Sequence, residues 1–232
     1  MTPAANPSTN VAPASAAPYV VPFAVFMVLL AASGWMQSIL GRWEFPLRAL
    51  ILFATLYIFS RSVIDFRIRF LLPGILLGAA VFVLWIGPDL LFPGYRQHWL
   101  FQNALTGTLR GSVDDKFRSD TMVLFFRGLR AIVLVPIIEE LFWRAWLLRW
   151  LISPRFESIP LGTFTWTSMI VSAVLFASEH GPYWEVGLLT GFIYNWWMVR
   201  TKSLGDCILI HAVTNACLSA YVIIAGRWEY WL

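Results

Sequence analysis

Long apolar segments separated by short polar or basic joints make up most of this 232-residue chain. A helix needs about 20 apolar residues to cross the hydrocarbon core of a bilayer. The segments that are long enough, or nearly so, are 19–40, 46–64, 70–88, 121–151, 163–180, 184–200 and 204–226. Composition agrees, because 59% of the residues are hydrophobic and 13% charged, against roughly 45–50% and about 25% in soluble domains. The sequence therefore predicts a membrane protein.

In lipid, backbone polar groups must be hydrogen-bonded within their own segment, so apolar runs of this length fold as helices. We expect an all-α, polytopic transmembrane helical bundle with about seven spans, in a single domain over residues 19–232. The N-terminal tail, residues 1–18, is Pro-rich and uncharged and is expected to be disordered. No basic segment precedes the first apolar run, which indicates a retained helix rather than a cleaved secretory signal.

The net charge of +4 does not indicate a nucleic-acid partner, because the basic residues are scattered singly and form no basic helix face. Loop arginines beside anionic headgroups explain the excess, so membrane lipids are the expected partners. The positive-inside rule leaves the orientation open. Its outcome depends on whether Arg127 and Arg130 belong to the long connection 89–120 or to the helix that follows.

Glu139, Glu140 and Arg144 lie within the otherwise apolar run VPIIEELFWRAWLL, where each charge is costly. Glu140 and Arg144 are four residues apart and can pair on one face of a helix. Glu139 is turned by about 100° from Glu140 and lacks that partner. An unpaired carboxylate in an apolar site is suited to act as a general base. The alternative is a purely structural role, in which Glu140 and Arg144 form an ion pair and Glu139 is either protonated or extends its carboxylate to the membrane interface.

His180 closes the apolar segment VLFASEHGPYW, with Phe176 one turn earlier and Gly181-Pro182 immediately after it. Glycine followed by proline ends a helix. A helix that ends part-way through the membrane exposes His180 to an internal cavity. The alternative is an interfacial histidine at an ordinary helix end. Glu179 is expected at the level of the headgroups.

His211 and Asn215 lie in the segment LIHAVTNACL, four residues apart, so both side chains point the same way from one helix. An imidazole and a carboxamide can direct two donors at one point. The alternative is an interhelical hydrogen-bonding pair, which is common in membrane proteins. These groups can meet His180 only if the helix before Gly181-Pro182 ends below the membrane surface, as we expect, or if the next helix is short.

Together, one cavity holding Glu139, His180, His211 and Asn215 would have the groups of a hydrolase: a base for water and donors for an oxyanion. The chain has only three histidines, and two of them occupy these places. The motifs Gly-x-Ser-x-Gly and His-Glu-x-x-His are absent, so neither a serine nucleophile nor a zincin site is indicated. The two cysteines are ten residues apart on one helix, roughly 15 Å, which is too far for a disulfide.

At these residues the sequence resembles the CAAX protease and bacteriocin-processing family, the type II CAAX prenyl endopeptidases. That family has three ordered motifs: Glu-Glu-x-x-x-Arg, Phe-x-x-x-His and His-x-x-x-Asn. Here they are Glu139-Glu140-Leu-Phe-Trp-Arg144, Phe176-Ala-Ser-Glu-His180 and His211-Ala-Val-Thr-Asn215. The resemblance covers about residues 121–226, the motif-bearing part of the domain. The first three predicted helices carry no motif.

The resemblance implies an all-helical intramembrane endopeptidase that cleaves near the C-terminus of a protein or peptide substrate, with or without a lipid modification. It assigns activation of water to Glu139 with His180 and the oxyanion hole to His211 and Asn215. Glu140, held by Arg144, would order the site and could share in the base function. The expected location is the bacterial inner membrane or an equivalent membrane.

No cofactor is expected. A zinc site built from Glu139, His180 and His211 is sterically conceivable, but Asn215 suits an oxyanion better than a metal, so the metalloprotease is the second choice. The rival class is a non-enzymatic membrane protein, either a bacteriocin-immunity-type binder or a transporter, that uses the buried groups for binding or proton relay. A transporter often shows internal repeats, and none is visible in the sequence.

Overall fold

The computed structural model describes residues 15–231, and within this range every regular element is a helix. A single isolated bridge joins Asn103 and Gly107. The all-α prediction is therefore confirmed. Most of the expected N-terminal tail, residues 1–14, lies outside the described residues, and the first helix begins at Ala17.

The first apolar region forms two helices instead of the predicted single one over 19–40, because the helix is interrupted at Ala32. The elements here are α1 (Ala17–Ala31), α2 (Ser33–Leu40), a turn (Gly41–Trp43), α3 (Glu44–Thr55) and a wider π turn (Leu56–Ser60). From Ser33 to Ser60 these elements form one apolar helical run of 28 residues. The long helix of this region therefore begins at Ser33.

The helix that carries Glu139 and Glu140 is continuous over Thr121–Trp150. Two π turns interrupt its regular α-helical geometry. Its parts are α5 (Thr121–Leu129), α6 (Val135–Glu140) and α7 (Leu148–Trp150), joined by π turns at Arg130–Leu134 and Leu141–Leu147. Pro136 follows the first π turn, and its missing N–H removes a hydrogen bond from the regular helix. Such π turns are frequent at functional sites, and Glu139 and Glu140 lie between two of them.

The remaining helices are α4 (Leu71–Leu91), α8 (Trp166–Ser178), α9 (Trp184–Thr201) and α10 (Leu204–Ala225). Side chains that accept backbone N–H groups cap two of them, Thr165 for α8 and Ser203 for α10. Asp206 in the first turn of α10 also accepts the backbone N–H of Phe70, at 2.9 Å. This bond fixes the start of α4 next to the start of α10.

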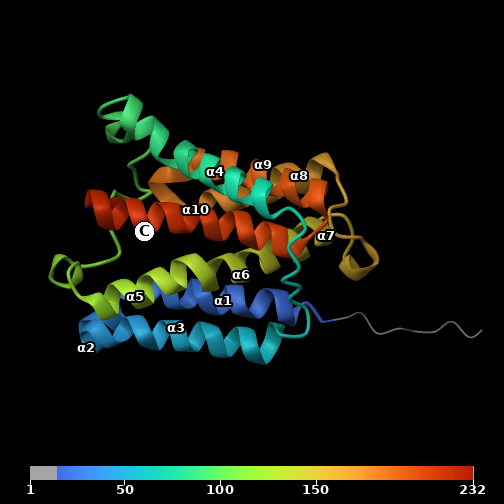
Figure 1. The fold of residues 1–232 in the computed structure, drawn as a ribbon, viewed down its shortest axis with the longest axis horizontal. Coiled ribbons are helices and arrows are strands. Elements are labelled where there is room, and N and C mark those ends of the chain that lie inside the picture. Colours follow the sequence, from blue (N-terminus) through green and yellow to red (C-terminus); the bar gives the residue numbers. More distant parts are fainter. Residues whose placement is uncertain (1–14, 232) are drawn as a thin grey trace, which may run out of the picture.

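The helices lie side by side along the long axis of the molecule, with α10 between α4 and α6 (Figure 1). α8 packs against α9, and α1 packs against α3. Gly78 of α4 permits the close approach of α10, since a Cβ at this position would lie 2.7 Å from the carbonyl oxygen of Ile210. Small residues commonly allow such contacts between membrane helices. This packing fixes the position of α10.

Four helical runs are long and apolar enough to cross a membrane: Ser33–Ser60, Leu71–Leu91, Thr121–Trp150 and Leu204–Ala225. α1 and α8 are apolar but shorter, with 15 and 13 residues. The predicted count of seven spans is therefore not confirmed. α8 ends at Ser178, and at about 1.5 Å per residue its 13 residues cover roughly 20 Å, less than the hydrocarbon core.

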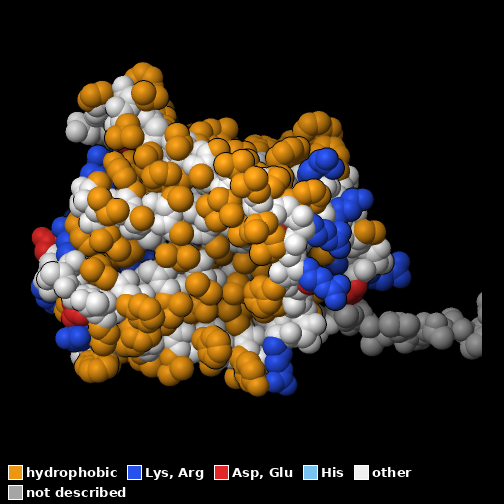
Figure 2. Space-filling view, in the orientation of Figure 1, with side chains coloured by type: hydrophobic (Ala, Val, Ile, Leu, Met, Phe, Trp, Pro, Cys, Tyr) orange, Lys and Arg blue, Asp and Glu red, His pale blue; other side chains and the backbone are white. Residues whose placement is uncertain are grey.

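The surface matches a lipid environment. Figure 2 shows apolar side chains over the middle of the bundle, while charged side chains gather toward its two ends. Exposed tryptophans lie near helix ends and connections, where indole rings favour the membrane–water interface: Trp35, Trp43, Trp99, Trp150 and Trp166. The protein is therefore an integral membrane protein.

Candidate active site

Glu140 is the centre of a buried polar cluster. Its Oε1 accepts hydrogen bonds from Arg144 Nη1, at 3.1 Å, and from His211 Nδ1, at 2.7 Å. Glu140 and Arg144 have no exposed side-chain surface. The i,i+4 pair predicted from the sequence is confirmed. The bond to His211 was not predicted, and it joins α6 directly to α10.

Arg144 is further held by two aromatic rings. Its guanidinium lies 4.5 Å from the ring centroid of Phe176 and 5.2 Å from that of Tyr194. A cation above an aromatic face is stabilised by the ring's quadrupole. The Phe of the second motif therefore has a physical role, because it packs against the Arg of the first.

Glu139, the residue before Glu140, faces a cavity. Its side chain is 6% exposed, and Oε2 has no hydrogen-bond partner among residues 15–231. No ion pair to Glu139 is present in that range either. The two adjacent glutamates therefore differ as predicted: Glu140 is paired with Arg144 and His211, whereas Glu139 has no ion pair among the described residues and lines the cavity.

His180 lies directly after the end of α8, before the short turn Gly181–Tyr183. Its Nδ1 lies 2.7 Å from the carbonyl oxygen of Phe176. A carbonyl can only accept, so Nδ1 carries the proton and, in the neutral ring, Nε2 has a free lone pair. Gly187 of α9 makes room for the ring, since a Cβ there would lie 3.2 Å from its atoms. The predicted helix end before Gly181 is confirmed.

Asn215 lies one turn after His211 on α10, and both line the same cavity. The Asn215 Nδ2 donates to the carbonyl oxygen of Ala131, at 2.8 Å. Ala131 belongs to the π turn before α6, where the backbone departs from regular α-helical bonding. This bond fixes the orientation of the Asn215 amide relative to the helix that carries Glu139.

One cavity of about 170 Å³ brings the predicted groups together. Glu139, His180, His211 and Asn215 all line it, whereas the buried Glu140 and Arg144 are not among its lining residues. The other lining residues include apolar side chains from α1 and α10 and a second polar group: Phe26, Met27, Leu30, Leu218, Arg48, Arg127, Arg130 and Glu179. The internal cavity that the sequence suggested is therefore present.

Four of these lining residues were not predicted from the sequence to be part of the site. Glu179 was expected at headgroup level, yet it lines the cavity. Arg127 and Arg130 were considered only for membrane orientation, and Arg48 was not considered. Their positions could have been predicted, because the three arginines lie inside apolar segments. Charged residues within membrane spans usually face the interior of the protein. Both Arg127 and Arg130 lie within the spanning helix, not in the connection before it.

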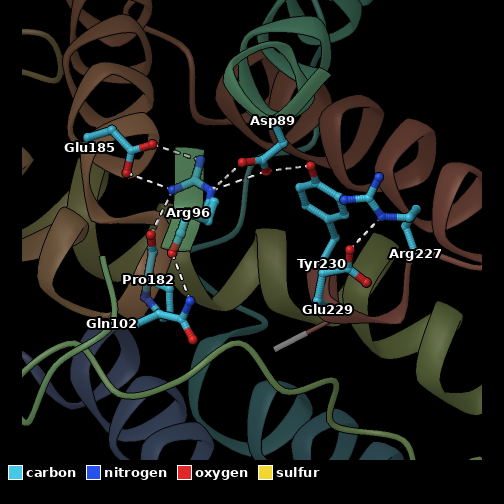
Figure 3. A network of polar contacts seen from close by, with 8 residues as sticks. All are labelled: Asp89, Arg96, Gln102, Pro182, Glu185, Arg227, Glu229 and Tyr230. Carbon is cyan, nitrogen blue, oxygen red and sulfur yellow. Dashed lines mark hydrogen bonds and ion pairs between the residues drawn. The ribbon is translucent and has the colours of Figure 1, made fainter. Parts of the chain in front are cut away.

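A polar network holds the turn that follows His180 (Figure 3). Arg96, in the long connection, donates to the carbonyl oxygen of Pro182 at 2.7 Å and pairs with Glu185 and Asp89. Its guanidinium also lies 4.1 Å from the ring centroid of Tyr183. The long connection therefore holds the turn Gly181–Tyr183, which directly follows His180, in place through Arg96.

No three His, Cys, Asp or Glu side chains within residues 15–231 are arranged so that they could hold a metal ion. The three conceivable zinc ligands, Glu139, His180 and His211, share the cavity without forming such a group. His211 has one ring nitrogen committed to Glu140.

Residues 121–217 match the model of a known protein family, described as type II CAAX prenyl endopeptidase Rce1-like. The chain contains an Rce1-like segment. All three motifs, from Glu139 to Asn215, fall within the match, which confirms the resemblance seen in the sequence. No curated protein and no solved structure matches the chain significantly. By that description the matched family consists of prenyl endopeptidases.

Proposed function

We propose that the protein is an intramembrane endopeptidase that cleaves a peptide bond near the C-terminus of its substrate. The observation that carries this proposal is the single cavity lined by Glu139, His180, His211 and Asn215. These residues come from three segments that are distant in the sequence, and together they supply a base and oxyanion donors. A bacterial inner membrane or an equivalent membrane is the proposed location.

In the first step Glu139, together with His180, activates water. A carboxylate oxygen of Glu139 without a protein partner accepts a proton from water, while the His180 Nε2 lone pair orients the same water. The oxygen of that water attacks the carbonyl carbon, and the carbonyl becomes an oxyanion. Positioned bases of this kind typically contribute about 10²–10⁴-fold in rate.

His211 and Asn215 stabilise the oxyanion. Because the His211 Nδ1 donates to Glu140, its Nε2 donates to the oxyanion when that nitrogen also carries a proton. Asn215 uses one amide N–H for Ala131 and has a second available. When the intermediate collapses, the protonated Glu139 gives its proton to the leaving amine.

Glu140 and Arg144 act as positioning residues in this proposal, because neither lines the cavity. Arg144 holds Glu140, and Glu140 holds the ring of His211. A carboxylate that accepts from one ring nitrogen in this way fixes the orientation and the tautomer of the histidine ring.

The experiment that tests the function is a proteomic comparison of C-terminal peptides in cells that express the wild-type protein or the Glu139→Gln variant. Glutamine keeps the size of the side chain but cannot accept a proton from water. We expect a set of shortened C-termini that depends on Glu139 and is retained by Glu157→Gln, a matched change at an exposed position. Identical C-termini with all three proteins would contradict the proposal.

A further inference from the structure

The cavity contains charged groups that the proposed reaction does not use. Arg48, Arg127 and Arg130 line it together with the reacting residues, and all three are buried. Guanidinium groups stay protonated in proteins, so each brings a full charge into the interior. Burying such a charge is costly unless an anion offsets it.

The carboxylates of the described residues do not saturate this cluster. Arg48 pairs with Glu44 at 2.5 Å through Nη1, but Arg48 Nε and Nη2 have no hydrogen-bond partner within residues 15–231. Arg130 is 4% exposed, and its Nη1 likewise has no partner in that range. Arg127 is engaged separately, by Ser112 at 3.2 Å and by the ring of Trp231. The donors available to a ligand are therefore on Arg130 and Arg48.

We propose that Arg130, together with Arg48, binds the α-carboxylate at the C-terminus of the substrate. A planar guanidinium matches a carboxylate in a two-bond arrangement. The inference rests on the proposed function, and it adds a binding subsite beside the reacting groups. Arg130 in this role is a specificity residue that selects substrates with a free C-terminus.

The spacing of the residues supports a peptide ligand. Arg130 and Glu139 lie on one continuous helix, nine residues apart, which corresponds to roughly 12–14 Å at about 1.5 Å per residue. An extended peptide covers roughly 3.3 Å per residue, so that distance holds about four residues. A carboxylate bound at Arg130 therefore places a peptide bond only a few residues from the C-terminus beside Glu139.

The walls near these two residues suit an apolar chain end. Val135 lies between Arg130 and Glu139 in sequence and lines the cavity, as do Phe26, Met27 and Leu30 of α1. Apolar side chains of a bound peptide gain free energy by leaving water at such a surface. A cavity lined by buried arginines and by apolar side chains favours a ligand with a terminal anion and an apolar stem.

The test uses two pools of fluorescent eight-residue peptides, with the last four positions randomised among apolar residues. The pools differ only in ending with a free acid or an amide. Binding to the purified full-length Glu139→Gln protein is measured, so that no cleavage occurs. Hydrogen bonds to a charged group predict that the acid pool binds ~10- to 100-fold more tightly than the amide pool.

Variants added to the same background assign the preference to a residue. Arg130→Gln is expected to bind the acid pool as weakly as the amide pool, and Arg130→Lys is expected to recover part of the preference. Arg110→Gln, at an exposed position outside the cavity, is expected to leave it unchanged. Equal binding of the two pools, binding of neither, or an acid preference that survives Arg130→Gln would overturn the carboxylate subsite.

A lipid phosphate has the same anionic chemistry, and a separate arm distinguishes it. Phosphatidylglycerol is added to the detergent micelles, and its effect on the thermal unfolding of the Arg130→Gln and unsubstituted proteins is compared. We expect the same stabilisation of both. Stabilisation that requires Arg130, without an acid preference in the peptide assay, would assign the site to lipid and overturn the proposal.

A cleavage assay with the wild-type enzyme separates this proposal from the proposed function. Equal cleavage of acid and amide peptides would refute the carboxylate subsite but would still support the endopeptidase activity.

Discussion

At the scale of single residues, Glu140 depends on Arg144 for the balance of its charge. Arg144→Ala removes one of two donors to a fully buried carboxylate and also the cation that packs on Phe176 and Tyr194. Removing one partner of a buried ion pair costs about 3–5 kcal/mol, so we expect a lower midpoint of thermal unfolding in detergent. The double change Arg144→Met with Glu140→Gln should recover much of the loss. An unchanged midpoint in Arg144→Ala would contradict the stabilising role of the Arg144–Glu140 pair.

Asn215 is expected to act in the transition state more than in binding. Loss of one oxyanion donor typically lowers kcat by about 100–1,000-fold, and Asn215→Ala should do so while KM stays close to normal. Cys217→Ala, two residues along the same helix, is the control. Steady-state kinetics on a cleaved peptide decide the matter, and a change confined to KM would place Asn215 in substrate binding instead.

At the scale of elements, the connection between α4 and α5, residues 92–120, contributes to the site through Arg96. This side chain fixes the carbonyl of Pro182 two residues after His180, and Asp89 joins the same network to Tyr230 (Figure 3). We expect Arg96→Met to release the turn Gly181–Tyr183 and to lower activity by about 100-fold, as small displacements of reacting groups can do. Hydrogen exchange of the turn's amides should rise in parallel. The control is Arg110→Met, and unchanged exchange in Arg96→Met would contradict the positioning role.

At the scale of the whole molecule, the apolar side chains on the face shown in Figure 2 and the four long helices predict firm membrane integration. Because helices buried in lipid leave it only at the cost of exposing their apolar surface, carbonate or high salt should not release the protein from membranes, whereas detergent should. Immunoblotting of the fractions checks this. Recovery in the carbonate supernatant would refute integration.

Independence of metal is the second prediction at this scale. The site proposed here needs a carboxylate base and hydrogen-bond donors, all supplied by the chain, so the purified enzyme should keep its activity after exhaustive chelation. Metal content and turnover are measured on the same sample. Stoichiometric zinc, with activity lost on stripping and regained on adding zinc, would favour the metalloprotease alternative instead.

Contacts within a single segment could be predicted from the sequence, because helical geometry fixes which residues of one helix lie next to each other. The apolar runs specified helices, and the four-residue spacings specified the Glu140–Arg144 pair and the common face of His211 and Asn215. Gly181-Pro182 marked the end of α8 in advance. The number of spans was less certain, since apolar segments of 13–18 residues lie near the length limit and their depth depends on their neighbours.

By itself, the sequence therefore determined that the chain lies in lipid, that it forms helices, and which reacting groups it carries. Tertiary structure alone decided which of them meet. His211 bonds Glu140 across 71 residues of chain, and Asn215 bonds Ala131 across 84. The same packing brought Arg48 and Arg130 into the cavity and made Arg96 a support for the turn after His180. The rotation and depth of each helix against its neighbours follow from side-chain packing between segments, and no spacing within a single segment encodes them.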